Sequence, residues 1–466
     1  MLDLIVRGGL VSTPTATLPL DIGVKDGKVA LLAAPGSIGV EAAHVEDAAG
    51  CHVVPGGIDA HVHFSFAATA TMQAQSAAAG TRAAAFGGTT TVIDFAWQRG
   101  SESLLAAIEQ RKEVFAAERP HVDYAFHAMM TGEISFEALE EMPEAIGEGV
   151  SSFKTFTTFS GASASGSLHT DDGRIWGVMQ QAARHGGLTM VHCEDDCLID
   201  FHVRGLYREG REHGSNIAEA RPSIVEEAAV ARMLLLARRS GSPLYVVHVS
   251  TIEAAEAIAE ARGRHLPVYG EVLHNQLVFT EDAYHRHNGL CFHNYPPLKS
   301  PGDRDALWAG LLADLSTTAS DDYTVPLAEK LSGQRVDNLT GGHNGVETRM
   351  GVLWSEGVAK GRLSVDRFVE LTSSGPAKVF GLYPQKGALL PGCDADIVVL
   401  DPALRQKLTL DALHSDCDYS VWDGWECNGY PRTTIARGEV LVRDGAWVGA
   451  QHRGRFVRCG VPAGRA

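Results

Sequence analysis

Residues 54–64 read Val-Pro-Gly-Gly-Ile-Asp-Ala-His-Val-His-Phe, a short apolar run and a glycine turn that lead into a strand ending in His61 and His63. Side chains two residues apart on a strand point to the same face, so both imidazoles can bind one metal ion, and Asp59 shares that face. Imidazole is a common ligand for zinc and similar ions. A His-x-His pair also arises by chance in a chain with 20 histidines, so a metal site needs further ligands elsewhere.

Downstream of this stretch, apolar runs alternate with helical stretches up to about residue 320. Predicted strands lie at 89–95, 122–129, 151–156, 188–193, 244–250, 268–273 and 315–320. Predicted helices lie at 104–118, 136–147, 173–185, 224–239, 252–262 and 300–312. This alternation predicts an α/β fold in which a parallel sheet closes into a (β/α)8 TIM barrel.

The two ends of the chain have a different pattern, with short strands separated by Gly and Pro turns. We expect them to pair into one small β-sandwich domain made of residues 1–53 and 385–466, which leaves residues 54–384 for the barrel. The length of 466 residues suits a barrel of about 250 residues plus such a domain.

Composition excludes several classes of protein. The hydrophobic content of 45% and charged content of 21% are those of a soluble globular protein. A formal charge of -17 argues against nucleic-acid binding, and no apolar stretch approaches the roughly 18 residues of a membrane span. The acid at Asp3 argues against a signal peptide. The eight scattered cysteines favour reduced thiols and a cytoplasmic location.

Polar groups close five of the predicted barrel strands, where barrel enzymes place their catalytic groups. These residues are His61, His63, Lys154, His192, His248 and Asp321. Each has an ordinary structural interpretation: a histidine can be a hydrogen-bonded core residue, Lys154 can pair with an acid, and Asp321 can cap a helix. Their joint occurrence, in barrel order, indicates one metal site.

The chain resembles the dihydropyrimidinase/hydantoinase branch of the amidohydrolase superfamily over nearly its full length. Besides Pro-Gly-Gly-Ile-Asp at 55–59, the likeness is carried by residues 87–95 (Gly-Gly-Thr-Thr-Thr-Val-Ile-Asp-Phe), 123–127, 344–350, 391–399 and 420–425. The resemblance implies a hydrolase of carbonyl–nitrogen bonds that acts on a small molecule and forms a homodimer or homotetramer.

The resemblance also implies the site chemistry. Carbon dioxide would carbamylate Lys154, and the carbamate would bridge two divalent ions, with zinc expected and cobalt or manganese as alternatives. His61, His63 and Asp321 would hold one ion, and His192 and His248 the other. Asp321 would also transfer the proton from attacking hydroxide to the leaving nitrogen.

Four positions depart from the family pattern. Phe159 stands where the family has a tyrosine that donates to the oxyanion, and Tyr295 stands where it has a serine that binds the ring amide. Gln75 and Ser76 replace an acidic pair. Asn344, the other expected substrate contact, matches.

These departures leave two interpretations of the substrate. Tyr295 supplies a relocated hydroxyl and the substrate remains a cyclic ureide or imide such as a hydantoin or dihydropyrimidine. Alternatively, Phe64, Phe66, Phe159 and Tyr295 line a more apolar pocket for another carbon–nitrogen bond, such as a carbamate or thiocarbamate of the molinate hydrolase type. A scaffold protein without metals would not need the ligands, and a mononuclear deaminase would not need Lys154.

Overall fold

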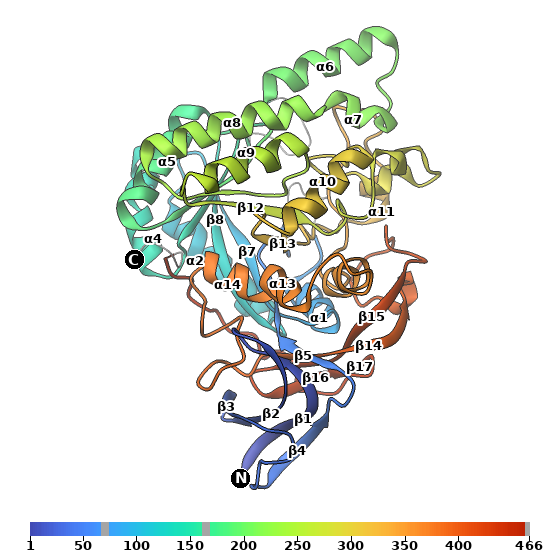
Figure 1. Ribbon diagram of the computed structural model, residues 1–466. Coiled ribbons are helices and arrows are strands. Elements are labelled where there is room, and N and C mark those ends of the chain that lie inside the picture. The colour runs from blue at the N-terminus through green and yellow to red at the C-terminus, as the bar shows by residue number, and fades with distance from the viewer. Residues whose placement is uncertain (67–73, 161–167, 462–466) are drawn as a thin grey trace.

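The computed structural model describes residues 1–66, 74–160 and 168–461. A barrel enclosed by helices lies above a sheet that is built from both ends of the chain (Figure 1). The predicted fold class is therefore confirmed.

Eight parallel strands form the barrel in the order of the sequence. They are β6 (Gly57–Asp59), β7 (Thr89–Arg99), β8 (Asp123–Thr131), β9 (Ser152–Phe156), β10 (Leu188–His192), β11 (Leu244–Val246), β12 (Val268–Leu273) and β13 (Thr317–Ala319). The first and last strands meet just beyond their ends, through a parallel bridge between Val62 and Asp322. The His63 N–H donates to the Asp322 carbonyl at 2.9 Å, which closes the barrel next to His61, His63 and Asp321.

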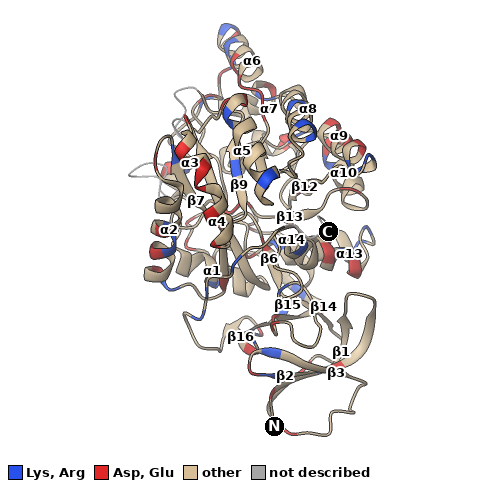
Figure 2. Cartoon of the chain, turned by 90° about the vertical axis from the view of Figure 1, so that its left-hand side faces the viewer, with Lys and Arg blue, Asp and Glu red and all other residues tan. Residues whose placement is uncertain are grey.

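Helices cover the outside of the barrel, and Figure 2 shows charged residues spread over them. The longer ones are α1 (Ala77–Phe86), α2 (Leu104–Glu118), α5 (Asp172–His185), α6 (Asp196–Glu209), α8 (Ser223–Ser240), α9 (Ile252–Gly263) and α10 (Pro301–Leu311). Side-chain caps define the starts of all of these except α8, as at α10, where Ser300 and Asp303 form a capping box. The predicted helix at 136–147 is two helices, α3 (Phe136–Glu140) and α4 (Met142–Gly147), with Pro143 in the first turn of the second.

Shorter helices complete this layer. They are α7 (Ile217–Ala220), α11 (Leu327–Lys330), α12 (Arg349–Leu353), α13 (Val365–Val369) and α14 (Gly375–Val379), with π-helical turns at Trp354–Val358 and Glu370–Ser374. None of the described helices is long and apolar enough to cross a membrane. All eight cysteines lie in the described ranges, and none forms a disulfide.

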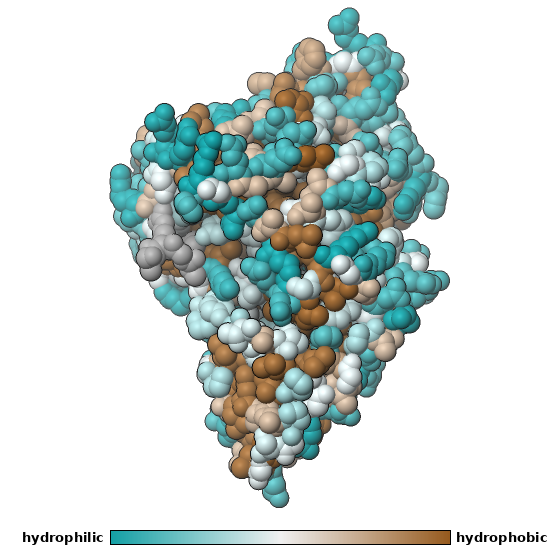
Figure 3. Space-filling view, viewed as in Figure 1, coloured by the Kyte–Doolittle hydropathy of each residue, from teal (hydrophilic) through white to brown (hydrophobic). Residues whose placement is uncertain are grey.

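The chain ends form one nine-stranded sheet. Its strands are β1 (Leu2–Ser12), β2 (Thr17–Lys25), β3 (Lys28–Ala33), β4 (Ala42–Asp47), β5 (His52–Pro55), β14 (Ile397–Lys407), β15 (Glu426–Ala436), β16 (Glu439–Arg443) and β17 (Ala446–Trp447). The antiparallel pair β5–β14 joins the two ends of the chain. Apolar residues gather over this sheet, whereas hydrophilic residues cover most of the helical layer (Figure 3).

The glycine pair at 56–57 carries the chain from this sheet into the barrel. A Cβ at Gly56 would lie 2.1 Å from the Thr90 hydroxyl oxygen, and one at Gly57 would lie 2.5 Å from the Met350 sulfur. No side chain fits at either position, because the turn passes directly against β7 and α12.

A buried ion cluster joins the barrel to the terminal sheet. The Lys386 ammonium lies 2.6 Å from Asp123 at the start of β8, 2.7 Å from Asp396 and 3.0 Å from Asp394. Lys28 reaches Asp394 from the sheet, and Arg437 reaches Asp123. The three carboxylates lie close enough together to bind a metal ion, but the Lys386 ammonium already lies among them.

We predict that Lys386→Met destabilises the fold by about 3 kcal/mol, because it leaves buried carboxylates without their central cation. Lys28→Met is the matched control: its side chain is 46% exposed against 1% for Lys386. Loss of such an exposed pair costs about 1 kcal/mol or less. Thermal unfolding of the two variants compares them directly, and equal midpoints would contradict the assignment.

Candidate metal centre

The candidate site is a cavity at the carboxyl ends of the barrel strands. Its volume is about 120 Å³. All of the predicted metal ligands are among its lining residues: His61, His63, Lys154, His192, His248 and Asp321. The fold thus brings together side chains from five separate strand ends.

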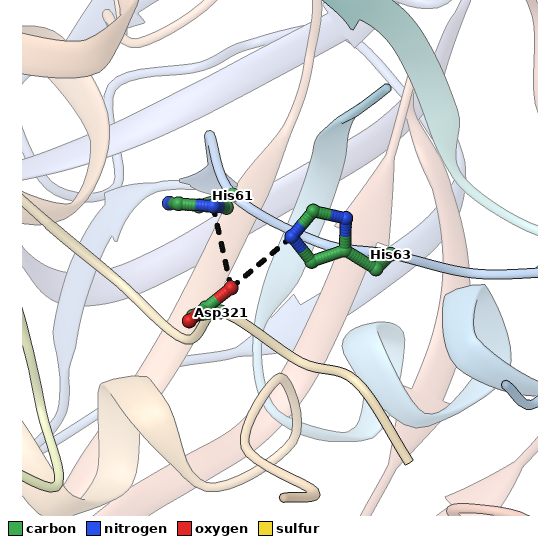
Figure 4. A group of neighbouring side chains, drawn as sticks. All are labelled: His61, His63 and Asp321. Carbon is green, nitrogen blue, oxygen red and sulfur yellow. Dashed lines mark ion pairs between the residues drawn. The ribbon is translucent and has the colours of Figure 1, made fainter. Parts of the chain in front are cut away.

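Asp321 lies between the two histidines of the first strand (Figure 4). Its Oδ1 is 3.3 Å from His61 Nε2 and 3.2 Å from His63 Nε2. Asn294 Nδ2 donates to the other carboxylate oxygen at 3.1 Å. Burial alone would raise the pKa of Asp321, but His61 and His63 outweigh it and hold that pKa well below its usual range. The carboxylate therefore stays ionised, as a metal ligand must.

Two of the candidate ligands follow their strands with a left-handed backbone. The φ angle is +50° at Asp321 and +39° at His248, conformations that are uncommon for residues other than glycine. Such backbone persists where the surrounding structure fixes it, and it is common at functional sites. Here it turns the chain at the strand end while the side chain remains in the cavity.

Glu271, on β12, orients two of the histidines. Its Oε1 accepts from His61 Nδ1 at 2.7 Å and from the His248 backbone N–H at 3.0 Å, and its Oε2 accepts from the Tyr245 hydroxyl at 2.8 Å. Because Nδ1 of His61 donates to this carboxylate, Nε2 is the nitrogen that faces Asp321. The sequence analysis missed Glu271, although it lies on an otherwise apolar strand, which is the signal that identified Lys154.

A second carboxylate plays the same part for His192. Glu194 Oε2 accepts from His192 Nε2 at 2.8 Å, which leaves Nδ1 as the nitrogen available for a metal. Arg221 donates to the same oxygen at 2.6 Å. The ring of His248 packs edge-on to that of His192, with centroids 4.5 Å apart. Burial lowers the pKa of both imidazoles, so they are neutral, the form that binds metal.

Lys154 lies on β9 and is 1% exposed. Its ammonium is 5.0 Å from the ring centroid of Phe156 and 5.5 Å from that of Phe95. Within the described part of the chain it has no hydrogen bond and no ion pair. Burial lowers the pKa of Lys154 to about 8, so part of the population is the neutral amine near neutral pH.

Aromatic rings form the wall beside His192. The ring of Phe159 lies 5.2 Å from that of His192 and 5.2 Å, edge-on, from that of Tyr295. The Tyr295 hydroxyl donates to the Leu339 carbonyl at 3.0 Å. In this arrangement the hydrogen of the Tyr295 hydroxyl points at a backbone carbonyl and not into the cavity.

Two of the predicted substrate contacts lie outside the cavity lining. Phe64 is fully buried, and its ring packs against Gly80 of α1. His61 and His63 face the cavity, so the next residue along an extended chain points away from it. Asn344 is buried and is not among the lining residues either. Lining residues that the sequence analysis missed include Trp97, Met129, Leu168, Tyr323 and Leu339.

The replacement of the acidic pair has a structural reason. Gln75 Nε2 donates to Asp322 Oδ1 at 2.9 Å, and its Oε1 accepts from the Asp416 backbone N–H at 3.1 Å. An acid at position 75 would face the buried Asp322 carboxylate, whose pKa burial raises to about 6. Ser76 caps α1 by accepting from the Ala79 N–H.

Comparisons with known proteins agree with this geometry. The model of the Amidohydrolase family matches residues 52–441. The chain is 37% identical over 463 residues to the D-hydantoinase of Streptomyces coelicolor, which covers 97% of both proteins. It is 35% identical over 460 residues to that of Geobacillus stearothermophilus, covering 97% of this chain and 96% of that protein. A dihydropyrimidinase from Brevibacillus agri superposes with a TM-score of 0.92 at 33% identity, over 99% of each chain.

Glu271→Gln should weaken metal binding by about tenfold or more, because the charge that orients His61 and His248 is lost while the side chain keeps its size. Competition with a chromophoric chelator, starting from metal-depleted protein, measures the affinity. Glu256→Gln, on the exposed face of α9, is the control. Equal affinities in the two variants would show that Glu271 does not orient the ligands.

Proposed function

Because this chain belongs to the amidohydrolase family, we propose that it uses two divalent metal ions to open the ring of a cyclic amide or ureide. It is a hydantoinase-like cyclic amidohydrolase that acts on carbon–nitrogen bonds, as its similarity to D-hydantoinases over its whole length establishes. The observation that carries the binuclear proposal is the convergence of four imidazoles, one carboxylate and one unpaired lysine on a single cavity.

The donor set suits two divalent ions. His61, His63 and Asp321 would hold one ion, because their donor atoms lie within 4.8 Å of one another. His192 and His248 would hold the other. Neutral nitrogen and carboxylate donors suit zinc, which we propose as the native ion, and also cobalt or manganese.

Lys154 would complete both coordination spheres as a carbamate. Its neutral amine would form a nitrogen–carbon bond to carbon dioxide and lose a proton to solvent, which would leave a carbamate with one negative charge. This reaction would replace a buried, unpaired ammonium by an anion between cations, so it also removes the cost of burial. The lowered pKa of Lys154, about 8, supports the proposal because the neutral amine is the reactive form.

Bound metal ions would lower the pKa of water and polarise the substrate carbonyl. Asp321 is ionised and is held in place by Asn294 through one carboxylate oxygen. Its other oxygen, beside His61 and His63, can accept the proton of the attacking nucleophile and return it to the leaving nitrogen.

The cavity wall favours a substrate with an apolar substituent. Phe66, Trp97, Phe156, Phe159 and Leu168 all line it. A carbamate or thiocarbamate is the second candidate, since Phe159 and the engaged hydroxyl of Tyr295 leave fewer polar partners for a ureide ring. We also propose a homodimer or homotetramer in the cytoplasm, as family resemblance suggests.

Lys154→Ala should abolish hydrolysis and lower the metal content, because the bridging anion is lost. A short carboxylic acid added with bicarbonate should restore part of the activity by occupying the vacated position. Lys360→Ala, at a half-exposed lysine, is the control. Full activity of the Lys154 variant, measured on a panel of hydantoins, dihydropyrimidines, imides and thiocarbamates, would refute the carbamate bridge.

Phe159→Tyr should shift the substrate preference toward ureides. We expect the native enzyme to open dihydrouracil and unsubstituted hydantoin slowly and a hydantoin with an apolar substituent faster. The added hydroxyl should raise kcat/KM for dihydrouracil about tenfold or more, in line with the effect of one oxyanion donor. Phe156→Tyr places the same hydroxyl elsewhere on the wall and is the control. Efficient opening of dihydrouracil by the native enzyme, unchanged in the variant, would contradict this specificity.

A further inference from the structure

Asp196, the first residue of α6, binds the turn that carries Phe159. Its Oδ1 accepts from the Thr158 hydroxyl at 2.8 Å and from the Phe159 backbone N–H at 3.0 Å. Its Oδ2 accepts from the Ser160 backbone N–H at 3.1 Å and from the Ser160 hydroxyl. Both oxygens of one carboxylate are thus used by three successive residues after β9.

This turn holds Phe159 in an unfavourable backbone conformation. Its φ angle is +72°, in the left-handed region that residues with a large side chain rarely adopt. Such a conformation persists only where its surroundings fix it. The hydrogen bonds to Asp196 act on Phe159 itself and on both of its neighbours, and a charged acceptor makes them strong.

The conformation sets the position of the ring. Phe159 is 6% exposed and its ring packs against those of His192 and Tyr295. Tyr295 is itself fixed by the Leu339 carbonyl and by the Arg221 guanidinium, which lies 4.4 Å from its ring centroid. The Arg221 guanidinium also lies 5.3 Å from the Phe159 ring centroid, so it packs on the ring while the Asp196 carboxylate holds the backbone that carries it.

We propose that Asp196 determines substrate specificity by holding the Phe159 ring as a fixed wall of the cavity, where it packs against the apolar substituent of a cyclic amide. Asp196 is a positioning residue, since it is not among the residues that line the cavity. This inference rests on the proposed function for the identity of the substrate, but the rigidity of the turn can be measured without any substrate.

The neighbouring acid provides a matched control. Asp195 caps α6 by accepting from the Leu198 N–H at 3.0 Å and binds Arg232 at 2.8 Å. Within the described part of the chain, Asp195 makes no hydrogen bond and no ion pair with the turn at 158–160. Asp195→Asn and Asp196→Asn are therefore the same chemical change at adjacent positions, and only the second acts on the wall.

Hydrogen exchange first tests the clamp, by which we mean the hydrogen bonds from residues 158–160 to the Asp196 carboxylate. The amides of Phe159 and Ser160 should exchange at least about tenfold faster in Asp196→Asn than in the native protein or in Asp195→Asn, because the opening of a local hydrogen bond controls exchange. Equal exchange in all three proteins would overturn the inference, whatever the substrate is.

Kinetics with the metal-loaded protein test specificity. Asp196→Asn should raise KM for 5-phenylhydantoin about tenfold, with a smaller change in kcat, and should leave unsubstituted hydantoin little affected. In a Phe159→Gly background, where glycine adopts the turn freely and no ring remains, Asp196→Asn should have no further effect on the ratio of the two substrates. An effect of the same size in that background would show that Asp196 does not act through Phe159.

The two possible failures are distinguishable. If the native protein opens no cyclic amide, the proposed function fails, while faster exchange in Asp196→Asn still supports the clamp. If the native protein prefers 5-phenylhydantoin and Asp196→Asn keeps that preference unchanged, the specificity inference fails and the proposed function stands.

Discussion

A parallel barrel loses its free edges only when its first and last strands meet, and in this protein they meet beside the candidate metal ligands. The bridge between Val62 and Asp322 and the bond from the His63 N–H to the Asp322 carbonyl close the barrel. The same contacts fix the backbone between His61 and His63 and next to Asp321. Closure of the barrel therefore brings His61, His63 and Asp321 together, and the other candidate ligands lie on or just after strands between these two.

The closed barrel imposes a cost, because it buries ionisable groups that water would otherwise solvate. Two buried carboxylates behind the histidines reduce that cost by accepting hydrogen bonds from them. Glu271 accepts from His61, and Glu194 accepts from His192. Lys154 has no such partner in the described structure, which is why a reaction that converts its ammonium to an anion is chemically reasonable there. The cost of burial and the proposed metal chemistry thus both explain why His61, His192 and Lys154 have these surroundings.

Much of this arrangement is encoded locally, and that part was predictable. β9 begins one residue after its predicted start and ends where predicted, because an apolar strand bounded by glycine and polar turns is a short-range signal. The candidate ligands could be proposed because each one lies within or just after such a run. Other features depend on which distant segments come side by side, and a single sequence does not show this. They are the contacts of Glu271, the Gln75–Asp322 hydrogen bond, and the hydrogen bonds from the Phe159 turn to Asp196. Phe64 shows the converse error, since a residue next to a ligand was placed in the pocket although strand alternation directs it outward.

The departures from the family pattern also differ in meaning once their contacts are known. Gln75 preserves local structure beside Asp322, whereas Phe159 and Tyr295 change the surface that a substrate meets. In the proposed function, the residues that would bind metal and those that would contact the substrate are thus different residues of one cavity lining. Elemental analysis of the protein purified with metal supplied during growth tests the centre most directly. The account predicts close to two divalent ions per chain; one ion would indicate a mononuclear centre, and none would indicate a scaffold, and either result would contradict it.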